Sequence, residues 1–85
     1  MPMKFKVLTP NNVLIDKSDV DYVQVFVESG AMGILPGHSP FIGRTIKSKI
    51  KYIADKNENY VDVENGFVIV NPDSVEVFFE TSEQR

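Results

Sequence analysis

The sequence contains no cysteine, no tryptophan and only 1 histidine, and it has no long apolar run. The absence of cysteine excludes a disulfide framework and a thiolate metal site, which favours a reducing compartment. No stretch resembles a signal peptide or a membrane-spanning helix, so we expect contact with a membrane only through another protein. His38 is poorly placed to act as a general base for the Ser39 hydroxyl, because neighbouring side chains in an extended chain point to opposite sides.

Positive charge is also scarce. The 9 Lys and Arg residues against 12 Asp and Glu residues give a net charge of -3, which argues against nucleic acid as a partner. No glycine-rich phosphate-binding loop occurs, so we expect no bound cofactor. Asp16, Asp19 and Asp21 have carboxylates of the kind that bind hard cations, but their spacing matches no EF-hand loop, and we expect no metal.

What the sequence does have is β-strand patterning from end to end. A chain of 85 residues fits one small domain. Residues 42–53 are ambiguous, because isoleucines recur there at helical spacing while lysines alternate strictly around them; the alternation accounts for more positions and favours a strand. We expect turns at residues 56–59 and 65–66. The other predicted strands are residues 4–8, 13–15, 19–27, 60–63, 67–70 and 75–80.

Regularly spaced strands with turn chemistry between them predict an all-β sandwich or barrel. Residues 67–70 are apolar on both faces, as expected of a strand that is covered on both sides. Residues 29–40 interrupt the pattern with glycines and prolines that fix a particular backbone path, and we expect a positive φ at Gly37. The apolar residues in this segment fit either a plug into the core or a contact for another protein, and spacing alone leaves both open.

Residues 33–40 carry a resemblance to a known family. They read Gly-Ile-Leu-Pro-Gly-His-Ser-Pro, which resembles the Gly-Ile-Leu-Pro-Gly-His-Ala-Pro signature of the epsilon subunit of F-type ATP synthase, with Ser39 in the place of the usual Ala. Residues 7–10 resemble the opening strand and turn of that family, and residues 65–67 resemble its Gly-Gly-Phe strand start. The resemblance covers essentially the whole chain.

The resemblance implies a flattened sandwich of about ten short antiparallel strands over residues 1–80, with a hydrophobic core between two sheets. It implies a non-catalytic subunit at the foot of the rotating central stalk, which binds the gamma subunit and the c-ring and couples ring rotation to ATP synthesis and proton transport. It also implies a peripheral position at the cytoplasmic face of the bacterial inner membrane, or at the equivalent organelle membrane.

The resemblance further assigns residues to the two partners. The family often carries acidic residues at the positions of Ser29 and Ala31, and neither is acidic here, so we expect an apolar footing on the ring with a smaller ionic part. The ring-facing residues are Ser29, Gly30, Ala31, Met32 and His38. The gamma-facing residues are Pro10, His38 and Gly43.

The family commonly continues into a C-terminal helical hairpin that inhibits ATP hydrolysis and in some members binds ATP. This sequence stops at Arg85, and Thr81 and Gln84 fit a capping box where a helix begins. Residues 81–85 are therefore expected to be a short tail. Whether the chain is naturally short or a piece of a longer protein stays open, so neither inhibition nor ATP binding is carried over.

Two interpretations from other functional classes also stay open. One is a small hydrolase that uses His38. The other is a β-barrel that binds single-stranded nucleic acid through a basic and aromatic face. Alternating lysines on an exposed sheet face also serve solubility, and the negative net charge favours that explanation. The residues of the nucleic-acid alternative are Arg44, Lys47, Lys49, Lys51 and Tyr52.

Overall fold

A computed structural model describes residues 2–80 of the chain, so the predicted capping box within residues 81–85 lies outside the described residues. The described part is all-β, as predicted, and among these residues no helix is long and apolar enough to cross a membrane. Its strands are β1 (Met3–Leu8), β2 (Val13–Val27), β3 (Gly30–Ile34), β4 (Phe41–Thr45), β5 (Ser48–Ala54), β6 (Asn57–Val63), β7 (Gly66–Asn71) and β8 (Ser74–Phe79).

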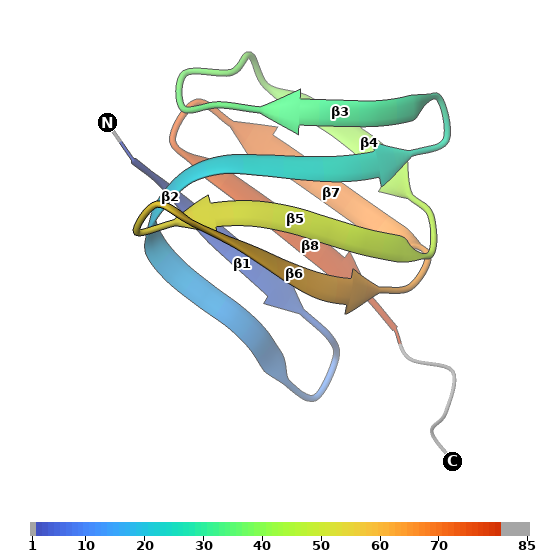
Figure 1. Cartoon of the computed structure of the whole chain (residues 1–85). Coiled ribbons are helices and arrows are strands. Elements are labelled where there is room, and N and C mark those ends of the chain that lie inside the picture. Colours follow the sequence, from blue (N-terminus) through green and yellow to red (C-terminus); the bar gives the residue numbers. More distant parts are fainter. Residues whose placement is uncertain (1, 81–85) are drawn as a thin grey trace.

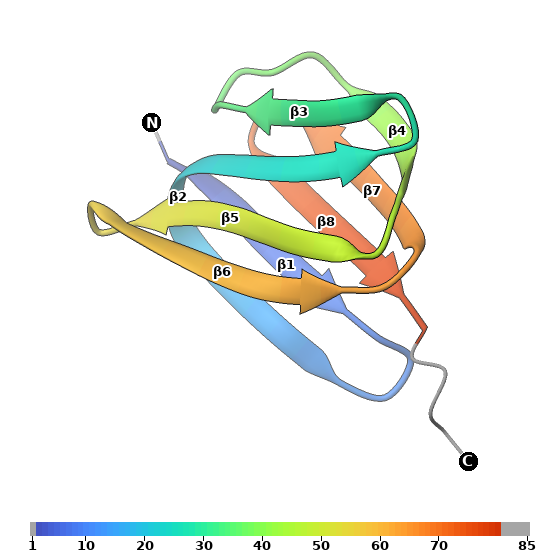
Figure 2. The ribbon, with the colours of Figure 1, turned by 45° about the vertical axis from the view of Figure 1, so that its right-hand side comes forward.

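The strands form one continuous hydrogen-bonded sheet that folds over into two layers (Figures 1 and 2). One layer contains β1, β8, β7 and β4, and the other contains β3, β2, β5 and β6. The long strand β2 belongs to both, because its first half pairs with β1 and its second half pairs with β3 and β5. The β1–β8 pair is parallel and the other pairs are antiparallel. The result is a flattened sandwich measuring 40 × 25 × 18 Å.

The hydrophobic core lies between the layers, and period-2 alternation accounts for most of it. Val23, Val25 and Val27 all point inward from β2, as their spacing predicts. The rings of Phe5 and Tyr52 meet across the interior with their centroids 5.0 Å apart. The buried side chains are Met3, Phe5, Val7, Val20, Val23, Val25, Val27, Ile34, Ile50, Tyr52, Ala54, Val63, Val68, Val70, Val75, Val77 and Phe79, with Thr45 as the buried polar residue.

Two predicted boundaries along β2 and β3 are wrong. Residues 13–15 and 19–27 form one strand rather than two, because the polar residues between them pair with β1 at the margin of the sheet and need no turn. The segment predicted to be a rigid loop begins as a strand, since residues 30–34 pair in register with residues 23–27. Gly30, with φ 130, closes this hairpin in a conformation that glycine adopts freely.

The strand prediction for residues 42–53 is confirmed and the helical alternative is wrong, yet the segment is two strands, β4 and β5, in different layers. The chain crosses between the layers at Ile46 and Lys47. The Ile46 N–H donates to the Phe26 carbonyl at 3.1 Å, and the Lys47 N–H donates to Asn65 Oδ1 at 2.8 Å. These two hydrogen bonds hold the crossing in place.

The predicted turn at residues 56–59 is also misplaced. The register pairs Ala54 with Asn57, so that the β5–β6 hairpin turns on Asp55 and Lys56 alone. Both residues have positive φ, 53° and 64°, which defines a type I′ turn. Strand β6 therefore starts earlier than the turn-forming composition of residues 56–59 suggested.

Candidate interaction surfaces

The outer side of the layer formed by β4, β7 and β8 carries large apolar side chains in addition to those in the core. Ile42 is 72% exposed, Phe67 48%, Ile69 40% and Phe78 41%. The strand register sets Ile42 opposite Ile69, and Phe67 opposite Phe78. Directly opposed side chains on one side of a sheet touch, so these four residues form a contiguous patch, here called the apolar face.

The apolar face corrects one expectation from the sequence. Strand β7 has an apolar residue at nearly every position, which predicted cover on both sides. Within the described chain only the inner side is covered, where Val68 and Val70 are buried. Charged groups rim the exposed side: the Arg44 guanidinium carbon lies 5.5 Å from the centroid of the Phe67 ring, and Glu76 is opposite Ile69. An apolar centre with a charged rim is the usual anatomy of a protein interface.

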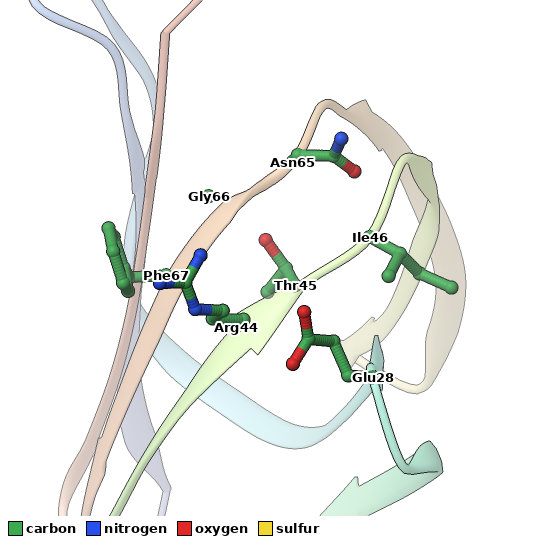
Figure 3. A pocket seen from close by; sticks show the side chains of 7 residues that line it. All are labelled: Glu28, Arg44, Thr45, Ile46, Asn65, Gly66 and Phe67. Atoms are coloured by element: carbon green, nitrogen blue, oxygen red, sulfur yellow. The ribbon is translucent and has the colours of Figure 1, made fainter.

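An open pocket of about 290 Å³ lies beside the apolar face, where β4 and β7 meet the β2–β3 turn (Figure 3). Two of its residues make hydrogen bonds that hold the fold. The Glu28 N–H donates to the Arg44 carbonyl at 3.2 Å, and Asn65 holds the crossing residue Lys47. Figure 3 shows the carboxylate of Glu28 on the side of the pocket below Thr45, with Asn65 across from it. The lining residues are Glu28, Arg44, Thr45, Ile46, Asn65, Gly66 and Phe67.

The predicted ring-facing residues fall into two places. Residues 29–32 are contiguous at the β2–β3 turn and the start of β3, where Ser29, Gly30 and Ala31 are exposed and Met32 packs half-buried against the core. His38 lies beyond the other end of β3. From Ser29 to the far end of β3 the chain runs through 5 residues at about 3.3 Å each, which is about 16 Å. The structure therefore does not bring His38 together with Ser29.

The loop that contains His38 is built on a type II turn. The His38 N–H donates to the Leu35 carbonyl at 3.1 Å, with Pro36 and Gly37 as the central residues. Gly37 has φ 91, so the expected positive φ is confirmed, and a type II turn requires it at this position. The Gly37 N–H donates to the Pro72 carbonyl at 2.7 Å and ties the loop to the β7–β8 turn.

The predicted gamma-facing residues lie around the apolar face rather than on it. Pro10 is exposed in the turn that follows β1, and His38 lies in the loop that precedes β4, so they flank opposite ends of the layer. Gly43 belongs to the inner side of β4, where a Cβ atom would stand 2.6 Å from Cε2 of Phe41. The exposed positions next to Gly43 are Ile42 and Arg44.

The structure does not assemble the face that the nucleic-acid alternative requires. Tyr52 is only 6% exposed and is part of the core, so no base can stack on it. Lys49 forms an ion pair with Asp62 at 2.9 Å, and Lys51 stands 5.9 Å from the centroid of the Tyr22 ring. Arg44 lies in the other layer, on β4. These residues do not form one basic and aromatic surface.

The geometry around His38 also gives the hydrolase alternative no support. His38 Nδ1 lies 2.7 Å from the Ser39 carbonyl oxygen, so the ring is engaged by backbone rather than by the Ser39 hydroxyl. Within residues 2–80, no three His, Asp or Glu side chains come together in a way that could hold a metal ion. The three aspartates considered above, at positions 16, 19 and 21, are exposed along β2.

Comparisons with known proteins agree with the resemblance seen in the sequence. Residues 2–85 match the family described as ATP synthase, Delta/Epsilon chain, beta-sandwich domain. The ATP synthase epsilon chain of Bacillus thuringiensis (strain Al Hakam) is 37% identical over 78 residues, which are 92% of this chain and 58% of that protein. The epsilon chain of Bacillus mycoides (strain KBAB4) gives the same values. The chain thus spans less than two thirds of the length of these relatives.

Solved structures show the same fold. A chain in the Euglena gracilis mitochondrial ATP synthase superposes with a TM-score of 0.83 at 15% identity, covering 91% of this chain and 49% of that one. A chain in the central stalk and c-ring structure of the Tetrahymena thermophila mitochondrial ATP synthase gives a TM-score of 0.75 at 10% identity, covering 95% and 65%. With the match over residues 2–85 and the identity to the Bacillus epsilon chains, this chain belongs to the β-sandwich family of ATP synthase delta and epsilon chains.

Proposed function

We propose that this chain is a non-catalytic subunit in the central stalk of a rotary ATP synthase, where it binds the gamma subunit and the c-ring and couples ring rotation to ATP synthesis. The observation that carries the proposal is the apolar face on β4, β7 and β8, which nothing in the described chain covers. Membership of the delta and epsilon chain family supports the choice of these two partners. In this role the chain is peripheral, at the cytoplasmic face of the bacterial membrane or its organelle equivalent.

The apolar face is the proposed binding surface for gamma. A small domain buries a modest fraction of its surface, so large exposed side chains such as Phe67 and Phe78 cost solubility unless a partner covers them. Covering one Ile or Phe fully contributes about 1.5–3 kcal/mol. A partner that covers the face would also stabilise the fold, because it binds only the native state. His38 and Pro10 would border this contact at its two ends.

The β2–β3 turn and the start of β3, residues 29–32, are the proposed footing on the c-ring. This region is exposed and carries no charge, in contrast to the Arg44 and Glu76 rim of the apolar face. The separation along β3 leads us to assign His38 to the gamma side and not to this footing. We assign Ile42 and Arg44 to the gamma surface instead of Gly43, because Gly43 lies on the inner side of β4.

Substitution of Ile42 by Asp tests the proposal. Ile42 is the most exposed residue of the apolar face, so Ile42→Asp should leave folding intact while weakening binding to purified gamma by about 10- to 100-fold. Tyr60→Asp is the matched control, because Tyr60 is 56% exposed on β6 in the opposite layer. Binding is measured by titration, and circular dichroism checks the fold. Unchanged affinity for Ile42→Asp together with a loss for Tyr60→Asp would place gamma on the other layer.

A further inference from the structure

Strand β3 is a free sheet edge without the usual protection. Within residues 2–80 the free edges are β3, β6, the first half of β2 and the part of β4 before Thr45, since each pairs on one side only. Exposed edges are normally blocked by charge, proline or a bulge. Strand β6 carries Glu58 and Asp62, and the first half of β2 carries Asp16 and Lys17. Strand β4 follows Pro40 and carries Arg44. Strand β3 reads Gly-Ala-Met-Gly-Ile, and its pairing with β2 shows no register shift.

The hydrogen-bond pattern shows which backbone groups of β3 face outward. The Phe26 carbonyl accepts from the Ile46 N–H, so Phe26 directs its backbone groups away from β3. Ala31 stands opposite Phe26 and therefore forms a non-hydrogen-bonded pair with it. Because this pattern alternates along an antiparallel pair, Gly33 is in the same position as Ala31. The N–H and C=O groups of Ala31 and Gly33 thus point to the open side.

The side chains around this edge indicate what fits there. Ala31 and Gly33 are exposed and contribute almost no bulk to the outer side of the layer. On the neighbouring strand, Phe26 is opposite Ala31, and the Tyr22 ring lies against Gly33, where a Cβ atom would stand 2.8 Å from the Tyr22 hydroxyl oxygen. The Tyr22 ring therefore lies over Gly33, and together with Phe26 it forms an aromatic ridge next to the open edge. An added strand with apolar side chains at alternate positions would extend that ridge.

We propose that the β3 edge accepts an extended, uncharged, apolar segment of another subunit as an additional strand of the sheet. The inference rests on the proposed function, because the assembly supplies the segment. A second copy of this chain fits the edge less well. Two β3 strands paired about Met32 would set Ala31 opposite Gly33, so neither strand would offer a large apolar side chain to the aromatic ridge. Such a pair of short strands would be the whole contact between two copies and would bury far less than the roughly 1,200 Å² of a specific interface, whereas a strand from another subunit would add to the larger contacts of the proposed assembly.

Amide hydrogen exchange on the unmodified chain is the first test. In the isolated chain the amides of Ala31 and Gly33 should exchange fast, because they have no acceptor, whereas the Met32 amide should be protected. The measurement is then repeated on the chain co-purified with the gamma and c subunits of its own ATP synthase. We expect the Ala31 and Gly33 amides to exchange at least about tenfold more slowly in that assembly.

A charged edge supplies the second test. Ala31→Lys places a lysine on the exposed side of β3, which should abolish the gain in protection at Gly33. Tyr60→Lys places the same charge on the edge strand β6 and should leave that gain unchanged.

If the chain co-purifies but Ala31 and Gly33 exchange as fast as in isolation, the edge inference is wrong and the proposed function stands. Failure to co-purify overturns both. Protection that grows with the concentration of the isolated chain would assign the edge to a second copy and overturn the inference.

Discussion

The turn between β5 and β6 stores backbone strain that a single substitution should release. Lys56 has φ 64 and Asp55 has φ 53, a left-handed conformation that costs an ordinary residue about 1–2 kcal/mol. Glycine adopts it without that cost, but the greater freedom of glycine in the unfolded chain lowers the free energy of unfolding by about 0.5–1 kcal/mol. We therefore expect Lys56→Gly to raise the free energy of unfolding by about 0.5–1 kcal/mol, because the first term exceeds the second.

The expected gain in the free energy of unfolding is measurable in a domain of this size. A change of 1 kcal/mol shifts Tm by roughly 4–8 °C in a domain of 60–100 residues, so we expect Lys56→Gly to raise Tm by about 2–8 °C. Urea titration followed by circular dichroism should show a higher midpoint with an unchanged m-value. Lys17→Gly is the matched control: Lys17 lies in β2, where glycine should lower stability by about 0.5–1 kcal/mol. A loss of stability in both variants would show that the turn is not left-handed in solution.

Further predictions concern single interactions, each measured by urea unfolding. Gly37→Ala should cost about 0.5–1 kcal/mol, because strain of about 1–2 kcal/mol is partly offset by the lost freedom of glycine in the unfolded chain, and a Cβ at Gly37 meets no atom within 4 Å. Gly66→Ala should cost about 1–3 kcal/mol through overpacking, since its Cβ would collide with the backbone of β8. Phe5→Ala, at a core position with 0% exposure, should cost about 3–5 kcal/mol. Lys49→Met should change stability by less than about 1 kcal/mol, because both partners of the Lys49–Asp62 pair are mostly exposed.

The sequence predicted the all-β class and the inward faces of the strands, because alternation of side chains follows directly from strand geometry. It missed β3, since Gly30 and Gly33 have the composition of a loop and become a strand only through pairing with β2. It missed the turn at Asp55 and Lys56 for a related reason. The register of the hairpin imposes positive φ on Asp55 and Lys56, and neither residue is a glycine that would have indicated it.

The apolar face shows a second limit of prediction from sequence. The composition of β7 indicated that both sides of this strand are covered, but composition cannot say whether the cover comes from the same chain. Only the layer arrangement shows that no strand within the described residues packs over Phe67 and Ile69. The same arrangement separates Arg44 from Lys49, which the sequence had grouped into one basic face.

The footing at residues 29–32 leads to a last prediction, on ionic strength. Exposed ion pairs weaken as the Debye length falls from about 10 Å at 0.1 M salt to about 3 Å at 1 M, whereas apolar and backbone contacts are screened little. Because Ser29, Gly30, Ala31 and Met32 carry no charge, retention of the chain on purified rings should change less than about twofold between these two salt concentrations.

A carboxylate introduced at the tip provides the contrast. Ser29→Glu adds a charge at an exposed turn position and should make retention salt-dependent, by up to about fivefold, as expected for an exposed pair worth about 0.2–1 kcal/mol. Met32 is a poor site for this test, because it packs against the core and an Asp there would weaken the fold itself. Co-sedimentation with the ring at each salt concentration gives the measurement. If salt releases the unmodified chain as readily as the Ser29→Glu variant, charged residues elsewhere carry the contact, and Glu28 beside the turn is the first one to replace.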